Sequence, residues 1–473
     1  MKAIDVHGFG GGFTLGVSQA GFELVAKKGR EVGFGVLNTL ANRHLLPGPW
    51  EVESDTPAQW VKEEANLVFG NPPCSGFSTL SPKHFRGTSS SINDYMWELV
   101  RYAGRVAPEI VIFESVQQAF TQGRPLMSAL LAELNEISGH TYTLHHVLHN
   151  NASTGGASIR RRYFWVAARV PFGVEGNATR YDYRTKELVR YELARVPSLH
   201  DVFVDLEPLT LTMNDQTYPG GHREETLTWN TTHGSWDVTY DDPWVDVRTG
   251  SWWTKEHMHD GTGLVDGHDI FRSPTLDRIQ EMMELEDWRE GERMSDVMRR
   301  HYERTGGLPM SWWYTTKKPM FDKQGNKMYD DNGKAMMEPI RKDARLIETD
   351  FAMGHNQPFR WYGSRMARVI TGGAVHLFVH PTQPRTFTHR EAARIQGFPD
   401  AWKIWPVRRA ADLGPGWGKG VPVHAGRWIA DWAKQSIEGE PGSNTGVIDE
   451  HGERIIQLTN LYKTLAAKIG DPG

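Results

Sequence analysis

The chain has 473 residues, a formal charge of -5 and one cysteine. With 39% hydrophobic and 23% charged residues it can bury a sizeable core, which excludes a disordered polymer. A single thiol excludes a disulfide framework and a zinc site built on several thiolates. The acidic balance gives no overall attraction for nucleic acid, so binding to DNA or RNA would need local clusters of Lys and Arg. No apolar run is long enough to cross a bilayer and the N-terminus lacks a signal-peptide pattern, so we expect a soluble, cytoplasmic protein without a membrane partner.

The N-terminal residues predict a strand, a glycine-rich turn and a helix. Residues 3–6 form a short apolar run, glycines cluster between residues 8 and 12, and a helical pattern follows over residues 16–20. This order is typical of the first unit of a doubly wound α/β sheet, in which the amides of the turn face a ligand. A glycine loop alone is weak evidence, because a plain tight turn gives the same pattern.

Further strand and helix patterns alternate up to about residue 170. Residues 67–69 predict a strand, residues 92–106 a helix, residues 110–113 a buried parallel strand that ends at Glu114, and residues 163–167 a strand that follows a basic run. In an open α/β sheet the ligand crevice lies beyond the carboxyl ends of the strands. The glycine loop, the loop after residue 69 and Glu114 each follow such an end, so we expect them to converge on one cleft.

The strand predicted at residues 67–69 leads into a loop, within the segment "FGNPPCSGFSTL", that contains the only cysteine, Cys74. A lone cysteine is often an inert buried residue. Here Pro72 and Pro73 fix the backbone and Gly76 permits a sharp turn, so the thiol is held rigidly at a strand end. That arrangement favours a nucleophile over a core side chain.

The sequence changes character after residue 170. Tryptophans cluster in "GSWDVTYDDPWVDVRTGSWW", and "FDKQGNKMYDDNGKAMM" predicts hairpins with glycine turns, so residues 171–380 read as a separate loop-rich domain. The tryptophans are expected in the core rather than stacked on bases, and neither "KEHMHDG" nor "DDNG" completes a metal-binding set, so no metal is predicted. Apolar helical patterns return over residues 381–437, and residues 438–473 resemble a linker with a polar C-terminal tail. We find no internal repeats.

Six of these segments together resemble the DNA cytosine-5 methyltransferases. In family order they are "DVHGFGGGFTLGVSQAGF", "NPPCSGFS", "FESV", "SIRRRYFWVA", "PRTFTHREAARIQGFPDAW" and "GKGVPV", and they cover about residues 1–170 and 380–435. The resemblance implies a Rossmann-like class I methyltransferase fold with a doubly wound sheet and a large inserted target-recognition domain, residues 171–380. It also implies double-stranded DNA as the partner of a monomer, with S-adenosylmethionine as the sulfonium donor.

The resemblance implies a role for each matched residue. Cytosine C5 is a poor nucleophile, so a thiolate, that of Cys74, would first add to C6 of a flipped base. Glu114 would protonate N3, Arg162 would bind the cytosine carbonyl and Arg160 would support it. The residues matched to the donor site are Asp5, His7, Phe9, Gly10, Gly11, Asp55, Pro73, Lys419, Gly420 and Val421.

One departure from the family pattern concerns the transferred group. The family carries Asn where this chain has Lys419, and an ammonium beside the sulfonium of S-adenosylmethionine is unfavourable. Carboxy-S-adenosylmethionine would pair with this lysine, so transfer of a carboxymethyl group to give 5-carboxymethylcytosine is nearly as well supported as methylation. Alternatively, the lysine extends to solvent or phosphate and methylation persists.

Other departures leave further classes open. Ser115 and Ser158 replace the family's Asn and Gln, and Lys27 and Lys28 stand where an acidic residue is expected after the second strand. An RNA cytosine-5 methyltransferase, an inactive DNA-binding relative and a thiol hydrolase built on Cys74 and a histidine are therefore alternatives. A restriction-modification role in a bacterium and modification of a phage genome in the infected host both fit.

Overall fold

The computed structural model describes most of the chain, and every structural statement below concerns the described part. The described residues are 1–29, 39, 42–53, 57, 60–78, 86–176, 178–191, 197–206, 226–230, 235–239, 274–309, 312, 315–322, 327–329, 336–341, 358–367, 369–370, 378–402 and 417–458. The chain divides into two compact units, of which the first comprises Met1–Phe271, Gly363–Val375 and Thr388–Gly473 and the second Arg272–Tyr362 and His376–Phe387. The second unit thus falls largely within the expected domain of residues 171–380, whereas residues 171–206 group with the first.

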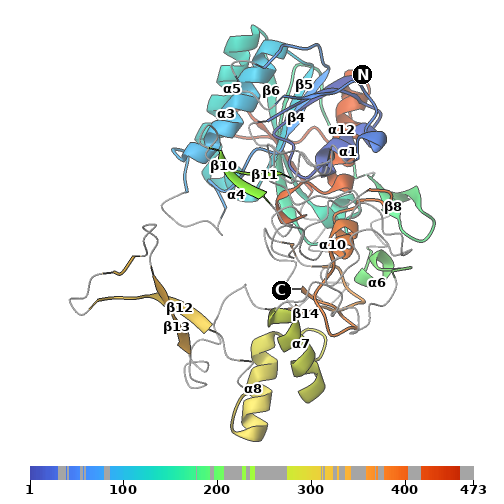
Figure 1. The fold of residues 1–473 in the computed structure, drawn as a ribbon. Helices are drawn as coiled ribbons and strands as arrows, with labels where there is room; N and C mark the ends of the chain where they lie inside the picture. The colour runs from blue at the N-terminus through green and yellow to red at the C-terminus, as the bar shows by residue number, and fades with distance from the viewer. Residues whose placement is uncertain are drawn as a thin grey trace. The chain divides into compact units, whose positions relative to one another are not determined.

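A nine-stranded sheet forms the centre of the first unit, with the order β16-β17-β6-β7-β5-β4-β1-β2-β3 (Figure 1). Its strands are β1 (Lys2–Val6), β2 (Glu23–Lys28), β3 (Val52–Glu53), β4 (Leu67–Gly70), β5 (Ile110–Ser115), β6 (Thr143–Asn150), β7 (Arg161–Ala168), β16 (Val447–Ile448) and β17 (Arg454–Gln457). The pairings are parallel except that β7 runs antiparallel to both β5 and β6, and β16 antiparallel to β17. The amino end of β7 therefore lies at the same edge of the sheet as the carboxyl ends of β4 and β5.

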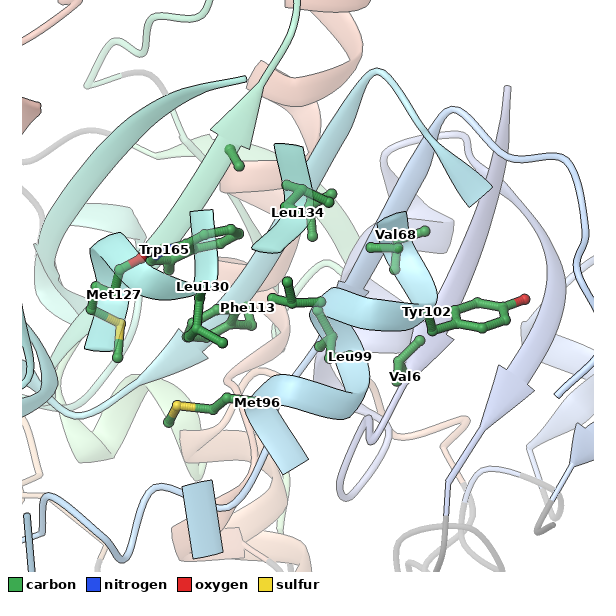
Figure 2. Packing of buried hydrophobic residues seen from close by; sticks show 14 of the residues in the cluster. Val6, Val68, Met96, Leu99, Tyr102, Phe113, Met127, Leu130, Leu134 and Trp165 are labelled. Carbon is green, nitrogen blue, oxygen red and sulfur yellow. Dashed lines mark hydrogen bonds between the residues drawn. The ribbon is translucent and has the colours of Figure 1, made fainter. Parts of the chain in front are cut away.

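Helices cover both faces of this sheet. They are α1 (Gly12–Gln19), α3 (Asp94–Val106), α4 (Gln117–Gln122), α5 (Arg124–Ser138) and α12 (Val423–Ile437). The first unit also has two short helices that contact each other, α6 (Leu199–Val202) and α10 (His389–Ile395). Helices α3 and α5 bury apolar side chains against one face of the strands, as Figure 2 shows for Leu99, Leu130, Phe113 and Trp165. On the other face Phe13 of α1 contacts Phe69 and Phe164, whose side chains point the opposite way because side chains alternate along a strand.

The structure confirms the strands predicted at residues 3–6, 67–69, 110–113 and 163–167 and the helix predicted over residues 92–106. The interpretation of residues 438–473 as a linker is wrong where β16 and β17 form. The run "RIIQ" is too short to predict a strand by itself, but pairing with β6 and complete burial of Ile456 stabilise it there. Residues 459–473, expected to be a polar tail, lie outside the described residues.

The second unit has its own small core. Helices α7 (Pro274–Leu285) and α8 (Met294–Thr305) surround the buried Trp288 and Trp312, beside β14 (Phe359–Arg360) and β15 (Phe378–Val379). Strands β12 (Thr315–Pro319) and β13 (Met337–Arg341) pair antiparallel. The segment in which hairpins were predicted, residues 321–337, leads from β12 into β13 and is described only in part, so that prediction is not tested.

Two further strand pairs belong to the first unit. They are β8 (Ala178–Asp182) with β9 (Glu187–Tyr191) and β10 (Thr226–Asn230) with β11 (Ser235–Thr239).

Some of the predictions concern residues that lie outside the described part of the chain. These residues are Asp55, the tryptophans after residue 240, and the "KEHMHDG" and "DDNG" segments. Among the helices that are described, none is long and apolar enough to cross a membrane.

Helices α1 and α12 approach so closely that a glycine is required between them. A Cβ atom at Gly16 would lie 2.5 Å from the backbone N of Arg427 and 2.6 Å from the carbonyl O of Val423. Both of these are backbone atoms, which cannot turn aside as a flexible side chain can. The N-terminal and C-terminal segments of the first unit are therefore matched in shape at this point.

We predict that Gly16→Ala destabilises the protein by about 1–3 kcal/mol, because the new methyl group forces the two helices apart. Urea denaturation measures the change. Gly176→Ala is the matched control, since its Cβ would meet no atom within 4 Å. Equal stability of the two variants would contradict the proposed contact.

Candidate functional site

The ends of three adjacent strands bring the matched catalytic residues to one edge of the sheet. Cys74 lies in the loop after β4, Glu114 near the carboxyl end of β5, and Arg162 near the amino end of β7. The β5–β7 register places Glu114 opposite Phe164 and Ser115 opposite Tyr163, so Arg162 lies diagonally across from Glu114 on the same face. The predicted convergence at this edge is thus present for these residues.

Glu114 is almost completely buried, with 1% of its surface exposed. Its Oε1 lies 2.8 Å from the Nε of Arg162, and its Oε2 accepts a hydrogen bond of 2.9 Å from the Nδ2 of Asn71. Burial raises the pKa of Glu114 even though Arg162, Arg160 and Asn71 each act to lower it. The carboxyl group therefore holds a proton more readily than an ordinary glutamate and can donate it within the site.

Asn71 is a site residue that the sequence analysis missed. It lies in the same loop as Cys74, immediately after β4, and only 5% of its surface is exposed. Its amide donates to Glu114 and so fixes the orientation of the carboxyl group. The available signal was its position: a polar residue directly after a buried parallel strand faces the ligand edge.

Cys74 has a free thiol and is half-buried, packed partly against the core under α3. Burial raises its pKa, Arg162 and Arg160 lower it, and Glu114 raises it. The net direction is upward, so the thiolate depends on the nearby guanidinium groups for its stability. Cys74 thus contacts the core and also lies close to the charged groups of the site, and its role as a nucleophile stays a prediction.

Arg160 connects the site to the closing segment of the sequence. It is buried, with 1% of its surface exposed, and donates to the carbonyl O of Gly418 at 2.6 Å, of Gly420 at 3.1 Å and of Ile370 at 3.3 Å. Burial lowers its pKa to about 9. Arg160 therefore supports the segment around Lys419, whose own side chain is exposed.

The glycine loop also meets this closing segment. Gly10 and Gly11 have left-handed backbones, with φ of 72° and 83°, and a Cβ at Gly12 would lie 2.1 Å from the carbonyl O of Val421. Val421 is buried. The structure thus brings the first and last matched segments together into a cradle that only glycine allows.

Asp5 and Lys27 form a buried ion pair beneath the glycine loop. The Oδ2 of Asp5 accepts from the Nζ of Lys27 at 2.5 Å and from the Oγ1 of Thr14 at 2.6 Å, and Lys27 also donates to the carbonyl O of Gly8 at 2.7 Å. Its second oxygen, Oδ1, has no hydrogen-bond partner in the described structure. One oxygen of Asp5 thus holds the loop itself in place.

The remaining matched positions have varied surroundings. His7 has a left-handed backbone and its Nε2 lies 3.2 Å from the Oε2 of the buried Glu98, while Lys28 pairs with Glu63 at 3.1 Å. Phe9 is half-buried and Pro73 is exposed. Both lysines that replace the expected acidic residue are therefore buried and paired with carboxylates.

Among the described side chains, no group of three His, Cys, Asp or Glu residues is arranged to hold a metal ion.

Strand order and site now define a class. Seven strands in the order β6-β7-β5-β4-β1-β2-β3, with β7 reversed and a glycine loop after β1, form the class I methyltransferase fold. Cys74 follows β4, and Glu114 lies near the carboxyl end of β5. The chain belongs to the C-5 cytosine-specific DNA methylase family, whose model matches residues 1–435.

Two curated relatives are similar to this chain in sequence, and one solved structure shares its fold. The chain is 27% identical over 170 residues to the type II methyltransferase M.AplI of Arthrospira platensis, covering 35% of this chain and 45% of that protein. It is 26% identical over 176 residues to the type II methyltransferase M.XorII of Xanthomonas oryzae pv. oryzae, covering 35% and 40%. The matched region thus spans less than half the length of these relatives. A crystal structure from E. coli, described as a DNA modification methyltransferase encoded within a prophage, shares the fold with a TM-score of 0.53 at 14% identity, covering 93% of this chain and 99% of that one.

Three fully buried histidines near the site predict acid sensitivity. Burial lowers the pKa of His149, His389 and His424 to about 3, below the value of about 6.5 expected in the unfolded chain. Their contribution to stability is complete above the unfolded pKa and is lost as the pH falls toward 3, on the order of 1–2 kcal/mol for each histidine at pH 5. Urea denaturation at pH 7.5 and pH 5.0 checks this, with His149→Phe expected to reduce the difference. The same free energy of unfolding at both pH values would contradict it.

Proposed function

We propose that this protein is a DNA cytosine C5 methyltransferase in which Cys74 is the nucleophile. The observation that carries the proposal is the buried Glu114, held by Asn71 and Arg162 at the sheet edge beside the Cys74 loop, with its pKa raised. A protonated carboxyl group in this position can neutralise N3 of a cytosine while a thiolate attacks C6. Membership of the family supports the same chemistry.

The proposed reaction balances through these residues. The thiolate of Cys74 forms a bond to C6, and Glu114 donates its proton to N3, which leaves C5 with enamine character. S-adenosylmethionine supplies an electrophilic methyl group to C5 when it is bound. A base then removes the proton at C5, the bond from sulfur to C6 breaks, and the thiolate of Cys74 is regenerated as N3 returns its proton to Glu114. Arg162 orients Glu114 and lowers the pKa of the thiol throughout.

The substrate base must leave the helical stack to reach this buried edge. Extrusion of one nucleotide costs roughly a few kcal/mol, which contacts elsewhere on the DNA would offset. We propose residues 171–380 as the region that makes those contacts and residues 1–170 with 381–437 as the catalytic domain. The second compact unit falls largely within the former.

The glycine cradle fits a sulfonium donor. Positive φ at Gly10 and Gly11 turns the backbone toward the carboxyl edge of β1, and Val421 closes the cradle from the other side. We propose Asp5, His7, Phe9 and Pro73 together with Asp55 and Gly420 as the remaining surroundings of the donor. The exposed side chain of Lys419 favours methyl over carboxymethyl transfer, because a solvated ammonium does not repel the sulfonium.

We predict that the wild-type protein converts cytosine in duplex DNA to 5-methylcytosine and that Cys74→Ala abolishes this. Glu114→Gln should lower kcat by about a hundredfold or more, because N3 loses its proton donor. The mass of nucleosides from digested DNA measures the product, and 5-fluorocytosine DNA should trap a covalent adduct only when Cys74 is present. Glu109→Gln, at the opposite end of β5 in a surface ion pair with Arg169, is the matched control.

Three results would argue against this assignment. Product on structured RNA but not on duplex DNA would favour the RNA methyltransferase. DNA binding without adduct or product would favour an inactive relative. Activity on thioester or peptide substrates that depends on Cys74 would favour the hydrolase.

The donor can be tested separately. With S-adenosylmethionine and carboxy-S-adenosylmethionine supplied at equal concentration, we predict mainly 5-methylcytosine. Lys419→Asn should change the product ratio by less than about twofold, because the side chain is exposed. A main product of 5-carboxymethylcytosine that reverts to 5-methylcytosine in Lys419→Asn would show that the lysine selects a carboxylated donor.

A further inference from the structure

The chain continues beyond the family match, which ends at residue 435, and part of the continuation joins the catalytic sheet. β17 pairs parallel with β6, with Ile455 opposite His146, and β16 pairs with the outer side of β17. Glu453 immediately precedes β17 and is buried, with 8% of its surface exposed. This segment is therefore an integral part of the sheet.

The carboxylate of Glu453 joins two neighbouring elements. Its Oε1 accepts a hydrogen bond of 2.6 Å from the Oγ of Ser128 in α5. Its Oε2 lies 2.6 Å from the Nη2 of Arg124, also in α5, and 2.8 Å from the Nε2 of His146 in β6. Asp449 also pairs with Arg124 and accepts the backbone N–H of Glu453 at 2.9 Å. These contacts fix both the position and the orientation of the carboxylate.

His146 connects Glu453 to Tyr163 of β7. Its Nδ1 lies 2.7 Å from the hydroxyl O of Tyr163. Burial raises the pKa of Tyr163 and lowers that of His146. Burial also acts to raise the pKa of Glu453, but its bonds from Ser128, His146 and Arg124 outweigh this and hold that pKa below its usual value. The neutral imidazole thus accepts a hydrogen bond from the Tyr163 hydroxyl at Nδ1 and donates one from Nε2 to Glu453.

This hydrogen-bonded chain is not a second active site. His146 and Tyr163 are both completely buried, so no substrate reaches either group. Tyr163 instead adjoins both catalytic candidates through the backbone, because it follows Arg162 in β7 and stands opposite Ser115, which follows Glu114 in β5.

Helix α4, which begins two residues after Ser115, packs against His146 and Tyr163 through Phe120. The ring of Phe120 lies 5.2 Å from that of His146 and 5.9 Å from that of Tyr163, and the guanidinium of Arg124 lies 4.9 Å from the Phe120 ring. The cluster formed by Glu453, His146, Tyr163, Arg124 and Phe120 therefore supports both strand ends that carry catalytic groups, on the face of the sheet opposite to Arg162 and Glu114.

We propose that Glu453 is a positioning residue for the reaction, which acts through His146 and Tyr163 on the alignment of Arg162 with Glu114. The inference rests on the proposed function. It assigns a catalytic contribution to a segment that lies outside the part of the chain matched by the family.

The test uses the full-length protein and the variants Glu453→Gln, Tyr163→Phe and the double variant. Each single change should lower kcat about tenfold and leave the KM for DNA and the Kd for S-adenosylhomocysteine nearly unchanged. The double variant should lose no more than the larger single loss, because both changes break the same chain of hydrogen bonds. Glu133→Gln is the matched control and should keep wild-type kcat. Glu133 is also in α5, and its ion pair with Arg101 of α3 lies at the surface.

A second measurement does not depend on turnover. Cys74 is the only thiol, so the pH dependence of its alkylation by iodoacetamide reports its pKa directly. If Arg162 is misaligned in Glu453→Gln, the midpoint should move to higher pH, because the guanidinium lowers the pKa of the thiol.

The possible results separate the two proposals. Wild-type kcat and an unshifted alkylation midpoint in folded Glu453→Gln, or losses that multiply in the double variant, would overturn the positioning role and leave the methyltransferase assignment intact. A wild-type protein that makes no 5-methylcytosine would refute the proposed function. The alkylation midpoint would still show whether Glu453 acts on the Cys74 site.

Discussion

The buried ion pair between Glu114 and Arg162 is the interaction on which the site depends, and it exists because β7 runs against its neighbours. A parallel β7 would place Arg162 at the opposite edge of the sheet. The reversed strand instead brings a guanidinium to within 2.8 Å of a carboxyl group that follows a parallel strand. The pair then influences the thiol of Cys74, since Arg162 lowers its pKa and Glu114 raises it.

Burial and charge act against each other throughout this site. Desolvation raises the pKa of Glu114 and of Cys74 and lowers that of Arg160, and each group is partly compensated by the others. Burial makes Glu114 hold its proton more firmly than an ordinary glutamate, while the neighbouring arginines oppose this, so the carboxyl group can be protonated and still donate its proton within the site. The same burial leaves the neighbouring histidines neutral, so the cationic charge of the site comes from arginine.

The sequence was most informative where chemistry and backbone geometry coincide. Glycines 10 and 11, the loop around Cys74 and Glu114 were placed correctly at the carboxyl edge, because each follows a short buried strand. Asn71 was missed although it directly follows β4, because the sequence does not reveal its hydrogen-bond partner, Glu114. Lys27 was read as a departure from the family, and only the structure shows that it pairs with Asp5 under the loop. β17 could not be predicted from "RIIQ", because its stability comes from pairing with β6, a distant part of the sequence.

That separation has a consequence for how the enzyme forms. Glu453 bonds to His146 across 307 positions of sequence, and Arg160 bonds to Gly418 across 258. Contacts of such long range are made late in folding, because a long loop must close before they contribute. During synthesis on the ribosome the strands that carry Cys74, Glu114 and Arg162 emerge well before their supports. Under the proposed role of Glu453, the alignment of Arg162 with Glu114 therefore requires residues as late as β17 to have left the ribosome.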